Sequence, residues 1–432
     1  MFKSVLGTFI GNVQAIRVFN EQIGRVADEH DRTVMQQFVD RLHDLLPEMK
    51  DIEGSVVFVP KTDEIEDDDT AGADTQAAEE SVGETRLAVD PETLRSVMKA
   101  MSSLGKRAPG QGPLLRRGAL TALTSFLEVL ISDLIQIYYS MYPAALPADT
   151  RKLSLAELRE QGSIEDAVKY LVSREVDGVL YEGLDDQLNY FSKQLKVNLG
   201  PLEGEREALV EVFQRRNLLI HNDGVVNRHY MSKVTPELIE KYQAELGTTI
   251  VVTENYLTAA IDSIYVTGLA LVQLCWRHWH KASTEQADSV VNDGLYQTLL
   301  DDRFDLTCRM ADRFKGIRFA NDDLARRATI NHAIALKELE RPEEMEAVLS
   351  RKDWSACGLG FKIALAALKN EEESFYELLP RAVAAKELLQ WHLEEWPLFA
   401  HQRSTERFSE AIAGHFGDGR AGRADGYNGH DE

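Results

Sequence analysis

The sequence predicts an all-α protein with at most a few short strands. Apolar residues recur at helical spacing along most of the 432 residues, as they do on the buried faces of amphipathic helices. N-capping residues, prolines at first helical positions and glycine stops divide these stretches into separate helices. Two short runs, 56–59 and 248–253, have the composition of strands. The expected order is a helical bundle followed by a C-terminal scaffold of helix pairs that is similar to helical repeats.

The first part of the chain is predicted to be an N-terminal helical segment, residues 1–61, that ends in the β-prone run. This run is either an edge strand or extended chain. Residues 62–86 are predicted to be a disordered acidic linker, because the stretch 62–85 holds ten acidic residues, no basic residue and almost no large apolar residue. Such a composition buries too little surface to offset the entropy of ordering. The Gly- and Asp-rich tail, 417–432, is predicted to be disordered for the same reason.

The central part, residues 87–282, is predicted to be one helical domain. Asp90-Pro91-Glu92 has the pattern of a helix start, and a broad apolar stripe predicts a long central helix from Pro113 to Tyr142. Asn222-Asp223-Gly224 has the turn chemistry that stops a helix. The other helices of this domain are expected over residues 155–160, 163–176, 185–195, 205–220 and 256–280.

The C-terminal part, residues 283–416, is predicted to be a helical scaffold like that of tetratricopeptide proteins, although no clean consensus repeats along it. All five tryptophans lie from Trp276 onward, and aromatic anchors suit a protein interface. A regulatory protein partner is therefore expected on this part. Its helices are predicted as Leu295–Phe314, Asp322–Glu340, Pro342–Ser350, Cys357–Lys369, Glu371–Leu389 and Arg407–Phe416.

Composition and charge narrow the possible functions. The chain has no long apolar stretch free of charge and no secretory pattern at its start, and its three cysteines form no CxxC pair. A cytoplasmic protein without a membrane span, a structural zinc or a disulfide framework is expected. The net charge of −23 disfavours sequence-independent binding of long nucleic acids. An RNA substrate would therefore be engaged over a small patch or delivered by a partner.

The segment from Arg215 to Gly224 holds the most informative group of residues. RNA is cleaved without a metal when its 2′-hydroxyl attacks the adjacent phosphate, which needs a proton acceptor and donor near neutral pH and a cation beside the phosphate. Histidine and arginine supply these groups. Asn217 and His221 share a helix face, so the amide is expected to orient the imidazole. Arg216 lies about 140° around the axis from His221, so either its long side chain reaches round or two subunits pool their residues.

Arg216-Asn217, followed by His221 after four residues, resembles the motif of the HEPN superfamily (higher eukaryotes and prokaryotes nucleotide-binding), and the resemblance extends over about residues 113–280. It implies a homodimeric, metal-independent endoribonuclease that needs no cofactor and leaves 2′,3′-cyclic phosphate ends. The RNA substrate would be tRNA or mRNA, and the context a stress response, a toxin–antitoxin system or antiphage defence. Glu128, Asp133 and Arg215 are supporting candidates; Arg215 either binds phosphate or is solvated.

Other Arg-to-His patterns and other functions compete with this hypothesis. The same Arg-to-His spacing occurs at Arg25–His30, Arg326 and Arg327 to His332, and Arg423–His430, which we assign to solvated or core positions. His278 and His280 point apart on a helix, so they are expected to pack rather than to bind a metal. The alternative functions are a non-catalytic helical adaptor for other proteins and a nucleotide-binding sensor that uses the same cleft without cleavage.

Overall fold

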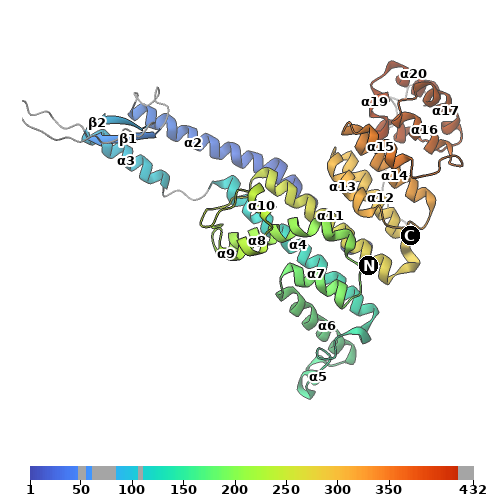
Figure 1. Ribbon diagram of the computed structural model, residues 1–432, viewed down its shortest axis with the longest axis horizontal. Coiled ribbons are helices and arrows are strands. Elements are labelled where there is room, and N and C mark those ends of the chain that lie inside the picture. Colours follow the sequence, from blue (N-terminus) through green and yellow to red (C-terminus); the bar gives the residue numbers. More distant parts are fainter. Residues whose placement is uncertain (47–54, 61–83, 106–109, 417–432) are drawn as a thin grey trace, which may run out of the picture. The chain divides into compact units, whose positions relative to one another are not determined.

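The computed structural model describes residues 1–46, 55–60, 84–105 and 110–416, and these are almost entirely helical (Figure 1). The predicted all-α class is confirmed. The chain divides into two compact units. One consists of Met1–Val13, Leu123–Thr248 and Ala259–Glu432, and the other of Gln14–Ala122 and Thr249–Thr258. The predicted domain boundaries remain a prediction.

The smaller unit joins helices to a two-stranded parallel ladder. Of the two alternatives for residues 56–59, an edge strand or extended chain, the structure has the strand, β1. Strand β2 was not predicted and begins inside the stretch expected to be linker. The paired register runs from Ser55 opposite Glu84 to Pro60 opposite Val89, and residues 61–83 lie outside the described part. The elements that build this unit or enter it are α1 (Phe2–Val18), the π-helix η1 (Phe19–Gly24), α2 (Arg25–Leu45), β1 (Ser55–Pro60), β2 (Glu84–Val89), α3 (Pro91–Gly105) and the start of α4 (Gln111–Met141).

Carboxylates of α2 hold the first turn of α4. Asp31 accepts hydrogen bonds from the backbone N–H groups of Gln111 and Gly112, at 2.9 and 2.8 Å, which satisfies donors that a helix start leaves unpaired. Asp28 accepts two hydrogen bonds from the buried Arg116 guanidinium, at 2.8 and 2.9 Å. A Cβ atom at Gly112 would lie 2.0 Å from Asp28 Oδ1. A side chain at this position would therefore displace the Asp28 carboxylate, which packs directly on the backbone.

The larger unit begins with a helical bundle around α4 and α11. Buried leucines of α4 and the almost wholly buried face of α11 form its core. Phe9 of α1 packs on Gly268, where a Cβ would lie 2.2 Å from the phenyl ring, and Phe2 stacks on Trp276. The helices are α4, α5 (Leu155–Gln161), α6 (Ile164–Tyr181), α7 (Leu184–Lys193), α8 (Glu203–His221), α9 (Arg228–Lys233), α10 (Pro236–Lys241) and α11 (Glu254–Trp279).

Local sequence signals account for several ends of these helices. Ser163 caps α6 as predicted, because its side chain accepts the N–H of Asp166. The short helices α9 and α10 were not predicted. Residues 248–253, the second β-prone run, are not a strand; the Thr248 carbonyl accepts the N–H of Val226 at 2.8 Å in an isolated pairing.

Two helices, α4 and α11, are long and apolar enough to cross a membrane by length and composition alone. Core helices of the same length pass the same test. Half of the most apolar window of α4 and 78% of that of α11 are buried inside the protein. For α11, this burial is the property of a helix that forms the centre of a bundle.

The C-terminal scaffold consists of successive antiparallel helix pairs. The predicted helix Leu295–Phe314 is wrong as a single element, because the chain breaks at Asp301–Arg303, where Asp302 has a positive φ of 54°. The region 390–403, predicted without helices, also forms short ones. The helices are α12 (Thr284–Leu300), α13 (Phe304–Phe314), α14 (Asp322–Glu338), α15 (Pro342–Leu349), α16 (Leu359–Leu368), α17 (Glu372–Ala384), α18 (Gln390–Glu395), α19 (Ala400–Arg403) and α20 (Glu406–Phe416).

The first helix of each of the first three pairs ends in the same way. Asp302, Glu340 and Asn370, which follow α12, α14 and α16, have φ angles of 54°, 56° and 56°. The N–H of the next residue in each case donates to a carbonyl of the last helical turn at 2.9 Å, which is a left-handed helix cap. The same cap also follows α17, the second helix of the third pair, where Lys386 has a φ of 57°.

Candidate functional site

Helix α8 positions the predicted catalytic residues and is fixed at both ends. At its start, the buried Glu205 carboxylate accepts hydrogen bonds from Nε of Arg309 and of Arg313, at 2.9 and 3.0 Å, so helix α13 holds this end. At its end, Gly224 has a φ of 79° and its N–H donates to the Leu218 carbonyl at 3.0 Å. This confirms the predicted stop. The expected buried face is confirmed as well, since Leu209, Val212, Phe213, Leu218 and Leu219 are all buried.

Arg215 belongs to a buried polar network. Its Nε donates to Glu211 Oε1 at 2.8 Å, the Tyr230 hydroxyl donates to the same oxygen at 2.7 Å, and its guanidinium lies over the Tyr242 ring. Burial and the Glu211 carboxylate raise the pKa of Tyr230. Arg215 itself is 3% exposed. It is therefore neither solvated nor placed to bind a phosphate, in contrast to the two roles predicted for it from the sequence. The spacing of four residues between Glu211 and Arg215 is the signal that would have found this pair.

Arg216, the next residue, is partly exposed and only loosely engaged. Its Nη1 donates to Asn217 Oδ1 at 3.1 Å, and its Nη2 lies 3.6 Å from Glu128 Oε2 of α4. The side chains of Arg216 and Glu128 are 23% and 25% exposed. Within the described residues, the buried Nε of Arg216 has no hydrogen-bond acceptor. A buried donor without an acceptor costs about 1–3 kcal/mol, so the guanidinium gains stability from an additional oxygen.

The two predicted supporting acids lie in different surroundings. Burial raises the pKa of Glu128, and the positive charge of Arg216 acts against this rise. Burial also raises the pKa of Asp133. In the part of the chain that the structure describes, however, Asp133 has no hydrogen-bond or ion-pair partner. The structure thus brings Glu128, but not Asp133, to Arg216.

His221 is the last residue of α8 and its side chain is exposed. Its ring makes no hydrogen bond to any residue of the described ranges, which leaves both ring nitrogens open to a ligand. The Asn217 side-chain oxygen accepts from Arg216, so in this structure the amide contacts the arginine and not the imidazole. The neighbouring Ile220 is 46% exposed. This end of α8 therefore presents an arginine and a histidine to solvent beside an apolar side chain.

The other Arg-to-His patterns differ from this site: burial lowers the pKa of His332, which follows Arg326 and Arg327, whereas His221 is exposed. Arg25 pairs with Glu254 in an exposed contact of 3.2 Å, and Arg326 pairs with the exposed Asp322 and Asp323 of its own helix. The pattern 423–430 lies outside the described residues. Trp279, between the two other candidate histidines, packs against Tyr138. In the described ranges, no three His, Cys, Asp or Glu side chains are grouped so that they could hold a metal ion.

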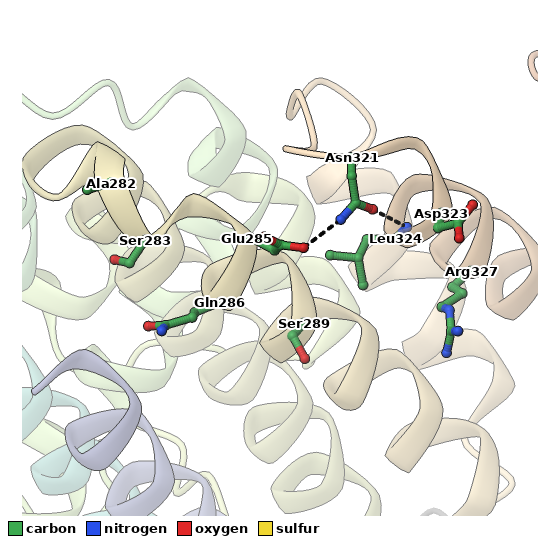
Figure 2. A pocket seen from close by; sticks show the side chains of 9 residues that line it. All are labelled: Ala282, Ser283, Glu285, Gln286, Ser289, Asn321, Asp323, Leu324 and Arg327. Atoms are coloured by element: carbon green, nitrogen blue, oxygen red, sulfur yellow. Dashed lines mark hydrogen bonds between the residues drawn. The ribbon is translucent and has the colours of Figure 1, made fainter. Parts of the chain in front are cut away.

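A pocket of about 510 Å³ lies in the scaffold and not at the end of α8. Figure 2 shows its polar lining from the first turns of α12 and α14, where Asn321 donates to Glu285 at 2.8 Å. Asp323 is paired with Arg326. Arg327, in contrast, is exposed and has no hydrogen-bond or ion-pair partner among the described residues. The pocket lining thus combines the unpaired guanidinium of Arg327 with two carboxylates, Glu285 and Asp323, that already have partners.

Comparison with known proteins returned no match: no family model, no curated protein and no solved structure matches this chain. Arg216 and Glu128 lie 3.6 Å apart, and His221 ends the helix that carries Arg216.

Proposed function

We propose that the protein is a metal-independent endoribonuclease whose site lies at the end of α8. The observation that supports this proposal is the state of Arg216: a half-buried guanidinium with an unpaired buried Nε–H and a long contact to Glu128. Such a group can donate hydrogen bonds to two oxygens of a phosphate in place of its weak internal partners. His221, exposed on the same helix end, supplies the proton acceptor.

The proposed reaction uses the RNA 2′-hydroxyl as nucleophile. His221 takes the proton of this hydroxyl, and Arg216 stabilises the negative charge that develops on the phosphate. The products are a 2′,3′-cyclic phosphate and a 5′-hydroxyl. Asn217 fixes the Arg216 side chain through their hydrogen bond, which keeps the guanidinium near the surface.

The resemblance stated from the sequence adds the biological part of the proposal. The substrate is a tRNA or mRNA, the protein acts in the cytoplasm as a homodimer, and the C-terminal scaffold receives a regulatory protein. The acidic net charge of −23 fits a substrate that is bound over a small patch and not along a long strand.

The test is cleavage of total cellular RNA and of tRNA in EDTA by the wild type and by Arg216→Ala and His221→Ala. The matched controls are Arg228→Ala and His229→Ala, which remove an exposed arginine and an exposed histidine of α9. We expect cyclic phosphate ends from the wild type and both controls, with a loss of about 10²- to 10⁴-fold in the two site variants. Equal cleavage by all five proteins, or none by any of them, would contradict the proposal.

A second candidate function is that of an adaptor for other proteins. It is favoured by the repeated helix pairs of the scaffold, by its polar pocket and by Trp391, which is 48% exposed. Exposed aromatic side chains on helical arrays are common anchors at interfaces. An adaptor should keep its cellular phenotype when His221 is changed to Ala and lose it when Trp391 is changed to Ala, whereas a nuclease should show the reverse.

A further inference from the structure

The proposed cleavage needs two proton transfers. The attacking 2′-hydroxyl must lose a proton, and the departing 5′-oxygen must gain one, because an alkoxide is a poor leaving group at neutral pH. At the end of α8, the His221 of one subunit can serve one of the two transfers in a given step. A second proton-transfer group should therefore lie close to Arg216, where the phosphate binds.

Glu128 occupies this place. It comes from α4, a different helix from that of Arg216, and its Oε2 lies 3.6 Å from Arg216 Nη2. A phosphate that binds the guanidinium with two oxygens must therefore lie next to this carboxyl group. At 25% exposure, Glu128 keeps an open side toward a ligand.

We infer that Glu128 is the general acid of the proposed nuclease and protonates the 5′-oxygen as it leaves, an inference that rests on the proposed function. His221 accepts the proton of the 2′-hydroxyl while the bond from the 2′-oxygen to phosphorus forms. The bond from phosphorus to the 5′-oxygen breaks, and the electron pair stays with this oxygen. The oxygen takes the proton of the neutral Glu128 carboxyl, and solvent returns both side chains to their starting states.

The surroundings of Glu128 fit both states that this role requires. Burial raises the pKa of its carboxyl group, which favours the protonated form before the reaction. Arg216, the group that opposes this rise, stabilises the carboxylate once the proton has been transferred. Proteins prepare carboxylic acids for proton donation by the same kind of burial. Burial also raises the pKa of Asp133, but no arginine lies beside it to stabilise the carboxylate after proton transfer.

The inference is tested with two substrates that differ in their leaving group. A dinucleoside monophosphate such as UpA releases an alkoxide, which needs a proton, whereas uridine 3′-(para-nitrophenyl phosphate) releases a stable phenolate, which does not. We expect Glu128→Gln to lower kcat/KM for UpA at least about 100-fold and to change that for the aryl ester by only a few-fold. His221→Ala should lower both, because both reactions need the base.

The control is Asp293→Asn, which makes the same kind of carboxyl-to-amide change in the scaffold. Burial raises the pKa of Asp293 as well, and a cation, Lys3, opposes the rise. This variant should cleave both substrates like the wild type. Thermal unfolding of each variant checks the fold, and Glu128→Asp, which keeps a carboxyl group, should recover part of the UpA cleavage.

The outcomes separate failure of this inference from failure of the proposed function. Equal losses on both substrates in Glu128→Gln would mean that Glu128 only positions Arg216, and no loss on either would remove it from the reaction; both results overturn the inference and leave the nuclease in place. A wild type that cleaves neither substrate, nor cellular RNA, overturns the proposed function itself.

Discussion

Arg215 and Arg216 are neighbours in the sequence, yet they lie in two different regions of the molecule. Arg215 points into the core, where it pairs with Glu211 under a Tyr242 ring. Arg216 points to the surface between α4 and α8, where its contacts are longer and one buried donor is unpaired. The comparison teaches that charge and position in a motif do not distinguish a structural arginine from a ligand-binding one. Burial and the length of the polar contacts do.

The largest expected effect on stability separates these two arginines. Arg215→Ala should lower the free energy of unfolding by about 3–5 kcal/mol, because it leaves the Glu211 carboxylate buried without its cation. Arg216→Ala should lower it by less than about 1 kcal/mol, since a partly exposed contact of this kind contributes little. Urea unfolding of the two variants measures the difference. Equal losses of unfolding free energy in the two variants would contradict the distinction between a structural Arg215 and a ligand-binding Arg216.

A smaller effect is expected in the other compact unit, where Arg116 resembles Arg215. Arg116 is 6% exposed and bound by both oxygens of Asp28. Gly112→Ala should push Asp28 away from this guanidinium and lower the free energy of unfolding by about 1–3 kcal/mol, the usual cost of overpacking. Gly118→Ala is the control, since a Cβ at Gly118 meets no atom within 4 Å. If both variants unfold at the same urea concentration, Asp28 does not lie against Gly112.

The smallest expected effect tests whether the charge of Arg216 acts on Glu128. Removal of its charge in Arg216→Ala should raise the pKa of Glu128 further, because this cation is what opposes the effect of burial. NMR titration of the side-chain carboxyl carbons measures this change, with Asp133 as an internal reference whose pKa should not move. A shift of both acids, or of neither, would show that Arg216 does not act on Glu128 specifically.

The sign of the accompanying stability change follows from linkage. Glu128 binds its proton more tightly in the folded than in the unfolded state, since burial raises its pKa. The folded state therefore loses stability as the pH rises through the two pKa values. Glu128→Gln should remove this loss, so that the variant gains on the wild type as the pH rises. A variant that gains as the pH falls would contradict the burial of Glu128.

Signals between near neighbours in the sequence were sufficient for much of the fold. The all-α class, the start of a helix at residue 163 and the stop after His221 were all predicted, because each depends on residues within one or two helical turns. The features that were not predicted depend on more than these local signals. Strand β2 exists through its pairing with a distant strand, and the break at Asp302 interrupts an apolar pattern that continues across it.

The site shows the same division. The sequence by itself determined that Arg216, Asn217 and His221 share one helix end, because helical periodicity and the Asn-Asp-Gly stop fix that placement. Only the tertiary structure decided that Arg215 is buried, that Glu128 and not Asp133 meets Arg216, and that α13 holds the start of α8. The physical reason is that burial and contacts between helices depend on how distant segments pack. A local pattern encodes the face of a helix, but not what covers it.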